Sequence, residues 1–233
     1  MLVKEFRIPM PLTVEEYKLG QIYYQNKLIV NEMQAKSGSI KSITKDEEYL
    51  SESGTRGLYS KKHYCLKENF PSVLQFMVSN DASLCEEIWN EYPYTRTLMT
   101  SNYLTKLRIE TFTHYLEDLG DTEGIFKDFS DMPQQINVET IDLSSHEPQE
   151  ATHPWLDTFT SSVSGRGPLK PGWLDAYHKN CIGSSIMCAY KLVTISCSYP
   201  LIRAKAESLL LEQAKKRIIE AHSRIWMAQD EWL

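Results

Sequence analysis

The fold is decided around residues 89–97, which read Trp89-Asn90-Glu91-Tyr92-Pro93-Tyr94-Thr95-Arg96-Thr97. Aromatic and β-branched residues fill this stretch, and such residues favour strands. The same character predicts strands over 57–66, 88–100 and 103–113, paired as an antiparallel meander. Strict alternation would place the side chains of Asn90 and Tyr94 on one face of the strand. It would place Thr95 and Thr97 on the opposite face, together with Trp89. Pro93 leaves that open, because a bulge there would change which side chains share a face.

Toward the N-terminus, a strand is expected from Val3 to Ile8, followed by a helix from Val14 to Asn26. Thr13 and Glu16 have the capping-box spacing that starts a helix. Residues 35–56 are rich in Ser, Gly, Lys and Asp and predict an exposed loop with one strand at 40–43. The acidic stretch 117–135 predicts a solvated excursion before a strand at 136–143.

Toward the C-terminus, a long irregular section up to residue 182 is either a functional cover or a partly disordered loop. Alternate apolar residues then predict a strand over 187–197 covered on both faces, with Lys191 interrupting one face. From residue 201 to 233 the apolar period becomes helical and predicts one amphipathic helix. At 1.5 Å per residue it would be roughly 45 to 50 Å long, enough to back a whole sheet.

Composition limits the class of protein. The chain has 233 residues with 42% apolar residues, so one substantial core is expected. A net charge of -6 argues against a non-specific nucleic-acid binder. Five cysteines without metal-ligand spacing indicate reduced thiols and no metal site. We find no signal peptide and no charge-free apolar run of about 18 residues, which predicts a cytoplasmic protein that does not span a membrane.

One polar pair lies in an apolar strand face. Ser60 and Lys62 alternate with Leu58, Tyr64 and Leu66. An ammonium group inside would need an anion, and a lipid phosphodiester is suitable. The alternative is that this face is exposed, or that Lys62 pairs with a protein carboxylate.

Other candidate residues give weaker signals. Glu86 and Asn90 offer acceptors and donors suited to a polyol ring. Thr97 and Thr111 have a plainer explanation in strand propensity. An enzyme is not expected, because Gly-x-Ser-x-Gly, P-loop and His-Glu-x-x-His motifs are absent from the sequence. A hydrolase using His63 or His114 would lack a defined nucleophile.

The quoted stretch resembles the class I phosphatidylinositol transfer protein family. Three further strings occur in the same order as in that family, at residues 57–64, 164–169 and 187–194. The resemblance runs from Glu5 to Trp232. It implies an α+β fold like that of the START and Bet v 1 group, a curved antiparallel sheet wrapped with long helices around a lipid cavity.

The resemblance also implies roles for individual residues. Ser60, in place of a family threonine, would bind the inositol ring with Lys62, Glu86 and Asn90. Gln21, Thr97 and Thr111 match positions near the phosphate or choline. Thr95 stands where animal members have a headgroup cysteine. Tyr199 and Pro200 align with the membrane-docking tryptophan pair and predict a weaker anchor.

We therefore expect a single domain, 1–233, that lacks the family's closing C-terminal helix and is a monomer or weak dimer. The expected function is a carrier that exchanges one phosphatidylinositol, and also phosphatidylcholine, between membranes that it contacts transiently. The alternative is a START-like sensor that presents lipid to a lipid kinase without net transfer. No cofactor is expected, since the phospholipid is cargo.

Overall fold

The computed structural model describes residues 1–34, 40–51, 53–65, 67, 72–127, 129, 133, 135–145, 156–179 and 185–233. Within these ranges the cysteines are free thiols, namely Cys65, Cys85, Cys188 and Cys197. Cys181 lies outside the described residues. None of the helices in the described part of the chain is long and apolar enough to cross a bilayer.

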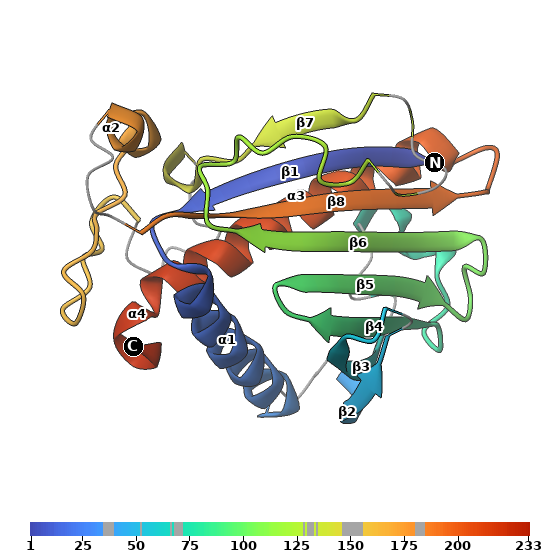
Figure 1. Ribbon diagram of the computed structural model, residues 1–233. Coiled ribbons are helices and arrows are strands. Elements are labelled where there is room, and N and C mark those ends of the chain that lie inside the picture. The colour runs from blue at the N-terminus through green and yellow to red at the C-terminus, as the bar shows by residue number, and fades with distance from the viewer. Residues whose placement is uncertain are drawn as a thin grey trace.

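Eight strands form one curved sheet in the order β2-β3-β4-β5-β6-β8-β1-β7. Their bounds are β1 Leu2–Met10, β2 Ile40–Leu50, β3 Arg56–Cys65, β4 Ser83–Glu91, β5 Tyr94–Ser101, β6 Leu107–Leu116, β7 Asn137–Thr140 and β8 Met187–Cys197. The expected α+β class is confirmed. The expectation of a wholly antiparallel sheet is wrong at one edge, because β7 pairs parallel to β1. Strand β7 joins there after the chain has crossed the face of the sheet (Figure 1).

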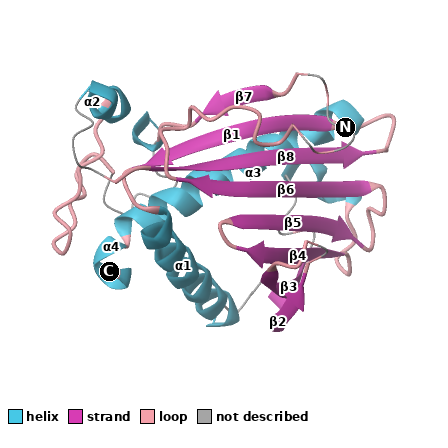
Figure 2. Ribbon diagram, in the orientation of Figure 1, coloured by secondary structure: helices cyan, strands magenta, loops and turns pink. Residues whose placement is uncertain are grey.

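Helices α1 Val14–Gln34 and α3 Arg203–Met227 lie over the other face of the sheet. The shorter helices α2 Trp173–Lys179 and α4 Gln229–Trp232 lie beside one end of the sheet, and short 3₁₀ turns occur at Ser72–Met77 and Leu143–Ser145. Figure 2 shows α3 running behind β1 and β8, with loop segments in front of the same strands. Strand β8 is therefore buried on both faces, as predicted. Met187, Ala189 and Val193 belong to the main core, whereas Cys188 and Tyr190 belong to a second cluster with Phe126.

The predicted strand 88–100 is in fact two strands. β4 ends at Glu91 and β5 begins at Tyr94, with Tyr92 and Pro93 in the turn between them. Proline lacks an N–H and has a fixed φ, which suits a tight turn better than a strand interior. Asn90 and Thr95 become direct cross-strand partners and so share a face, which corrects the strict alternation.

Several other boundaries differ from the predictions. The capping box is present, since Glu16 N–H donates to Thr13 Oγ1 at 3.1 Å, but α1 continues to Gln34 because residues 27–34 contain no helix breaker. Strand β2 extends to Leu50 where a loop was expected, and a polar strand is tolerated at a sheet edge. The predicted C-terminal helix breaks at Ala228. There Gln229 Nε2 and Trp232 Nε1 donate to the carbonyls of Trp226 and Ile225 and end α3.

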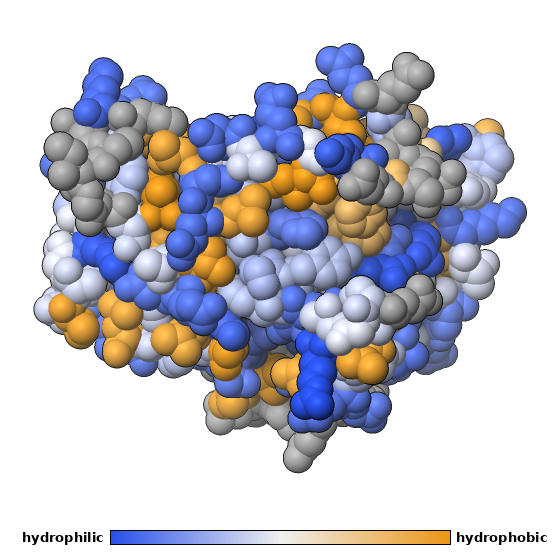
Figure 3. Space-filling view, viewed as in Figure 1, coloured by the Kyte–Doolittle hydropathy of each residue, from blue (hydrophilic) through white to orange (hydrophobic). Residues whose placement is uncertain are grey.

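Most of the surface in view is mixed in polarity. Figure 3 shows apolar side chains interspersed with hydrophilic ones on the face seen in Figure 1. Scattered apolar residues of this kind are ordinary on a protein surface. The distinctive polar grouping lies inside, between the helices and the sheet.

Candidate functional site

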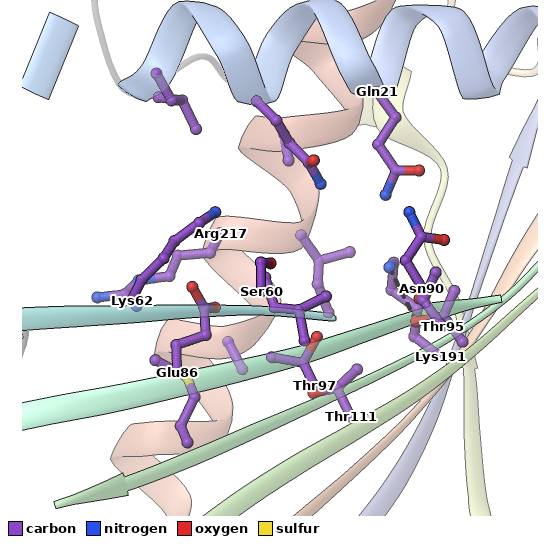
Figure 4. Close-up of a pocket in the computed structure, with 18 of the residues that line it drawn as sticks. Gln21, Ser60, Lys62, Glu86, Asn90, Thr95, Thr97, Thr111, Lys191 and Arg217 are labelled. Atoms are coloured by element: carbon purple, nitrogen blue, oxygen red, sulfur yellow. Dashed lines mark hydrogen bonds between the residues drawn. The ribbon is translucent and has the colours of Figure 1, made fainter. Parts of the chain in front are cut away.

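A pocket of about 410 Å³ lies between the inner face of the sheet and the helices α1 and α3. Figure 4 shows α1 along one side, α3 behind and the strands as the floor. Strands β3 to β6 and β8 all contribute side chains to its wall. All eight residues predicted to bind a headgroup line this pocket, namely Gln21, Ser60, Lys62, Glu86, Asn90, Thr95, Thr97 and Thr111.

Strand register arranges these residues in rows across the floor. One row joins five direct cross-strand neighbours, Leu58, Asn90, Thr95, Thr113 and Lys191. The next row joins Ser60, Ile88, Thr97, Thr111 and Val193. Because side chains alternate along each strand, one register brings all of these polar groups to the same face. The interpretation of the face of Ser60 and Lys62 as an interior one is confirmed.

Lys191 is the cation at the enclosed end of the first row. Its Nζ donates to Thr113 Oγ1 at 3.2 Å and lies 5.6 Å from the ring centroid of Tyr115. Burial lowers the pKa of Lys191 to about 8, because the ammonium loses its hydration. A hydroxyl and a ring face compensate this loss only in part. An anion beside this ammonium would therefore be electrostatically favourable.

A polar and aromatic cluster surrounds Lys191. Gln21 Nε2 donates to Tyr115 Oη at 3.0 Å, and Tyr17 packs 5.2 Å from Tyr115. The Tyr17 ring also stacks on His222, with the ring centroids 5.4 Å apart. Burial, together with the charge of Lys191, lowers the pKa of His222 to about 3, so this imidazole is neutral at ordinary pH.

The opposite end of the pocket carries more charge. Lys62 and Glu86 are cross-strand partners there, and Figure 4 shows Arg217 of α3 on the same side. Glu86 Oε2 accepts a hydrogen bond of 2.7 Å from Tyr64. Asp46 adds a second carboxylate to the lining. This end offers donors and acceptors of both signs, which suits a group rich in hydroxyls.

The two residues predicted to dock on membranes lie outside the pocket, in the turn between β8 and α3. Tyr199 is half-buried, and its hydroxyl accepts a weak hydrogen bond from Lys106 N–H at 3.5 Å. Pro200 is exposed, and Leu201 beside it is 100% exposed. The free apolar side chain of this turn is thus Leu201 and not Tyr199.

Sequence reasoning missed Lys191, Thr113, His222 and Arg217 as lining residues. A signal existed for Lys191, since it interrupts an otherwise apolar strand face. The positions of His222 and Arg217 depend on how α3 lies over the sheet, which helix periodicity alone does not give. Among the described residues, no group of three His, Cys, Asp or Glu side chains is arranged to hold a metal.

Comparison with known proteins gives a match over the full chain. The family model described as "Phosphatidylinositol transfer protein" matches residues 1–233. The "Phosphatidylinositol transfer protein beta isoform" of Rattus norvegicus is 31% identical over 242 residues, which cover 100% of this chain and 87% of that protein.

Larger proteins also contain a similar region. The "Membrane-associated phosphatidylinositol transfer protein 2" of Homo sapiens is 33% identical over 239 residues, and the "Protein retinal degeneration B" of Drosophila melanogaster is 32% identical over 251 residues. This chain is covered completely in both alignments, but it spans only 17% and 19% of the length of those two proteins.

Proposed function

Because this chain belongs to the phosphatidylinositol transfer protein family, we propose that it encloses one phosphatidylinositol molecule in its pocket and exchanges it between membranes. The family is one of lipid transfer and not of enzymes. The single observation that supports the proposal best is the row of polar side chains that ends at Lys191 inside the fold. Among the described residues no carboxylate forms an ion pair with this enclosed ammonium, which favours an anionic ligand.

The proposed binding mode follows the two ends of the pocket. The lipid phosphate would lie near Lys191, with Gln21, Thr97 and Thr111 close by. The inositol ring would extend toward Lys62 and Glu86, with Ser60 and Asn90 contributing hydrogen bonds. Thr95 replaces a thiol that the family resemblance predicts at this position. Phosphatidylcholine is proposed as a second cargo through the same phosphate contacts.

The size of the pocket bears on how cargo enters. A volume of about 410 Å³ is smaller than a whole phospholipid with two acyl chains. We propose that the walls of the pocket move apart during loading, when the protein is at a membrane surface. We propose that the turn at Tyr199 and Pro200 touches the membrane transiently, with Leu201 as its apolar contact.

The test is native mass spectrometry with lipid extraction, after equilibration of the protein with mixed vesicles. We expect phosphatidylinositol in the wild type and a loss of about 10-fold or more in Lys62→Ala, since hydrogen bonds to charged groups contribute most to such contacts. Lys61→Ala is the matched control, because Lys61 lies on the outer face and pairs with Glu87 at 3.7 Å. A wild type that takes up no phospholipid would refute the proposal.

A sensor that presents lipid to a lipid kinase without net transfer is the second candidate. The same pocket would serve both functions, so binding alone does not separate them. Transfer of labelled phosphatidylinositol between two vesicle populations by the purified protein is the discriminating measurement. A protein that loads lipid but moves none would be the sensor.

A further inference from the structure

His222 presents a hydrogen-bond acceptor without a partner. Its Nδ1 lies 2.7 Å from the Ile218 carbonyl oxygen, which can only accept, so Nδ1 must carry the proton. In the neutral ring Nε2 then holds a lone pair. This atom has no hydrogen-bond partner, and the side chain is only 1% exposed. A buried acceptor in this state is rare and calls for a physical explanation.

The position of the His222 ring indicates which group could donate a hydrogen bond to Nε2. His222 lines the pocket, and its Nδ1 edge is turned back to the helix that carries it. Tyr17 covers one face of the ring. On the floor of the same pocket, Asn90 Oδ1 also has no hydrogen-bond partner. Among the described lining residues, two buried acceptor atoms thus have no hydrogen-bond partner, and the buried cation Lys191 lines the same pocket.

We propose that His222 Nε2 accepts a hydrogen bond from the headgroup of the bound phospholipid, and so favours headgroups with O–H or N–H donors over choline. This inference rests on the proposed function. Inositol carries hydroxyls on both carbons that flank its phosphoester. A phosphate at Lys191 therefore brings ring hydroxyls toward acceptors at that end. Diacyl phosphatidylcholine has no donor at all and leaves His222 unpaired.

A buried acceptor without a partner can select between ligands. A site built to pair with a donor discriminates against a ligand that lacks it, because the buried acceptor then stays desolvated and unpaired. Phosphatidylethanolamine separates this effect from headgroup charge, since it is zwitterionic like phosphatidylcholine but has N–H donors. Solvent does not reach Nε2 in the present pocket. A donor gains access when the walls widen around the larger cargo.

The experiment measures which lipids the protein selects from vesicles of equal parts phosphatidylinositol, phosphatidylethanolamine and phosphatidylcholine. In His222→Phe, which keeps a ring for Tyr17, we expect the ratios of bound phosphatidylinositol and phosphatidylethanolamine to phosphatidylcholine to fall about 2- to 10-fold, the effect of one neutral hydrogen bond. His222→Gln restores an acceptor and should recover most of the preference. His114→Phe, a histidine on the outer face against Tyr94 and Phe126, should change nothing.

A second measurement needs no variant. The ¹⁵N signal of His222 Nε2 in the wild type should shift when phosphatidylinositol replaces phosphatidylcholine as cargo. An identical signal in both loaded states, or normal loading of His222→Phe with unchanged lipid ratios, would overturn the inference while the carrier function stands. No phospholipid in any variant, the wild type included, would instead refute the carrier function.

Discussion

Thr113 and Lys191 are direct cross-strand partners on β6 and β8, and the Lys191 ammonium donates to the Thr113 hydroxyl at 3.2 Å. Thr113 itself is only 2% exposed, so the pair lies within the fold. A hydroxyl is a modest substitute for water around a full positive charge. We therefore expect the protein without bound lipid to be less stable than a variant with an apolar residue at position 191.

The first prediction concerns Lys191→Met. Because burial lowers the pKa of Lys191 to about 8 from its ordinary 10.5, the unfolded chain binds more protons between these values. Stability of the empty wild type should thus rise as pH increases from 8 to 10.5, and the penalty is complete below pH 8. At pH 7 we expect Lys191→Met to be more stable by about 1 to 3 kcal/mol, measured by urea unfolding.

The same variant should lose function. Without the ammonium, phospholipid loading should fall, and the stability gain should vanish at pH 10.5 and above. Lys191→Arg keeps the charge and is the control for the pH dependence. A Lys191→Met protein that is less stable than the wild type at pH 7 would contradict this account of the pocket.

The second prediction concerns the loss of folding stability at low pH. The pKa of His222 is lowered to about 3 by burial and by the charge of Lys191, so the unfolded state binds its proton first as pH falls below 6.5. The wild type should lose stability from pH 6.5 toward pH 3 through this group, by a few kcal/mol in order of magnitude. His222→Phe removes this contribution, and the difference between the two unfolding curves isolates it. Parallel pH profiles would show that the ring is not shielded.

The third prediction concerns membrane contact. Leu201 is fully exposed in the β8–α3 turn, whereas Tyr199 packs partly against the core. Leu201→Ser should weaken vesicle binding by roughly 10- to 100-fold, since burying a leucine contributes about 1.5 to 3 kcal/mol. Leu201→Trp should strengthen it, and co-sedimentation with vesicles measures both. Lipid already loaded in the pocket should be unaffected, and equal binding by both variants would exclude this turn.

The fourth prediction concerns the packing of α1. A Cβ at Gly20 would lie 2.7 Å from Ile225 Cγ2 and 2.9 Å from Trp232 Cε2. Gly20→Ala should therefore destabilise the protein by about 1 to 3 kcal/mol despite its better helix propensity. Leu19→Ala, at an exposed neighbour, should cost far less. Chemical denaturation of both variants is the measurement, and a stabilised Gly20→Ala would contradict the close approach.

The sequence allowed part of the site to be predicted because strand periodicity is local. Ser60 and Lys62 could be assigned to one face from alternation alone, and the structure confirms that this face is interior. The face shared by Asn90 and Thr95 could not be assigned, because it depends on how many residues form the turn at Pro93. A one-residue uncertainty there reverses every side chain that follows.

The surroundings of Lys191 could not be predicted from the sequence. Its position was visible as a charged residue in an otherwise apolar strand face, but only the pairing of β6 with β8 brings Thr113 opposite it. His222 could not be predicted as a lining residue from local sequence, because its distance from the sheet is set by the packing of α3 on β8. Local sequence patterns predicted most helices and strands. The pocket depends on the long-range strand register and on where the helices pack against the sheet.

The row from Leu58 to Lys191 draws one residue from each of five adjacent strands. A mispairing by one position in any strand would replace its inward residue with an outward one, for example Thr95 with Arg96 or Thr113 with Phe112. No local segment of the chain can therefore form a partial version of this site. Correct pairing of all five strands is therefore a condition for the complete site, and loss of cargo binding would report a slip in any one of them.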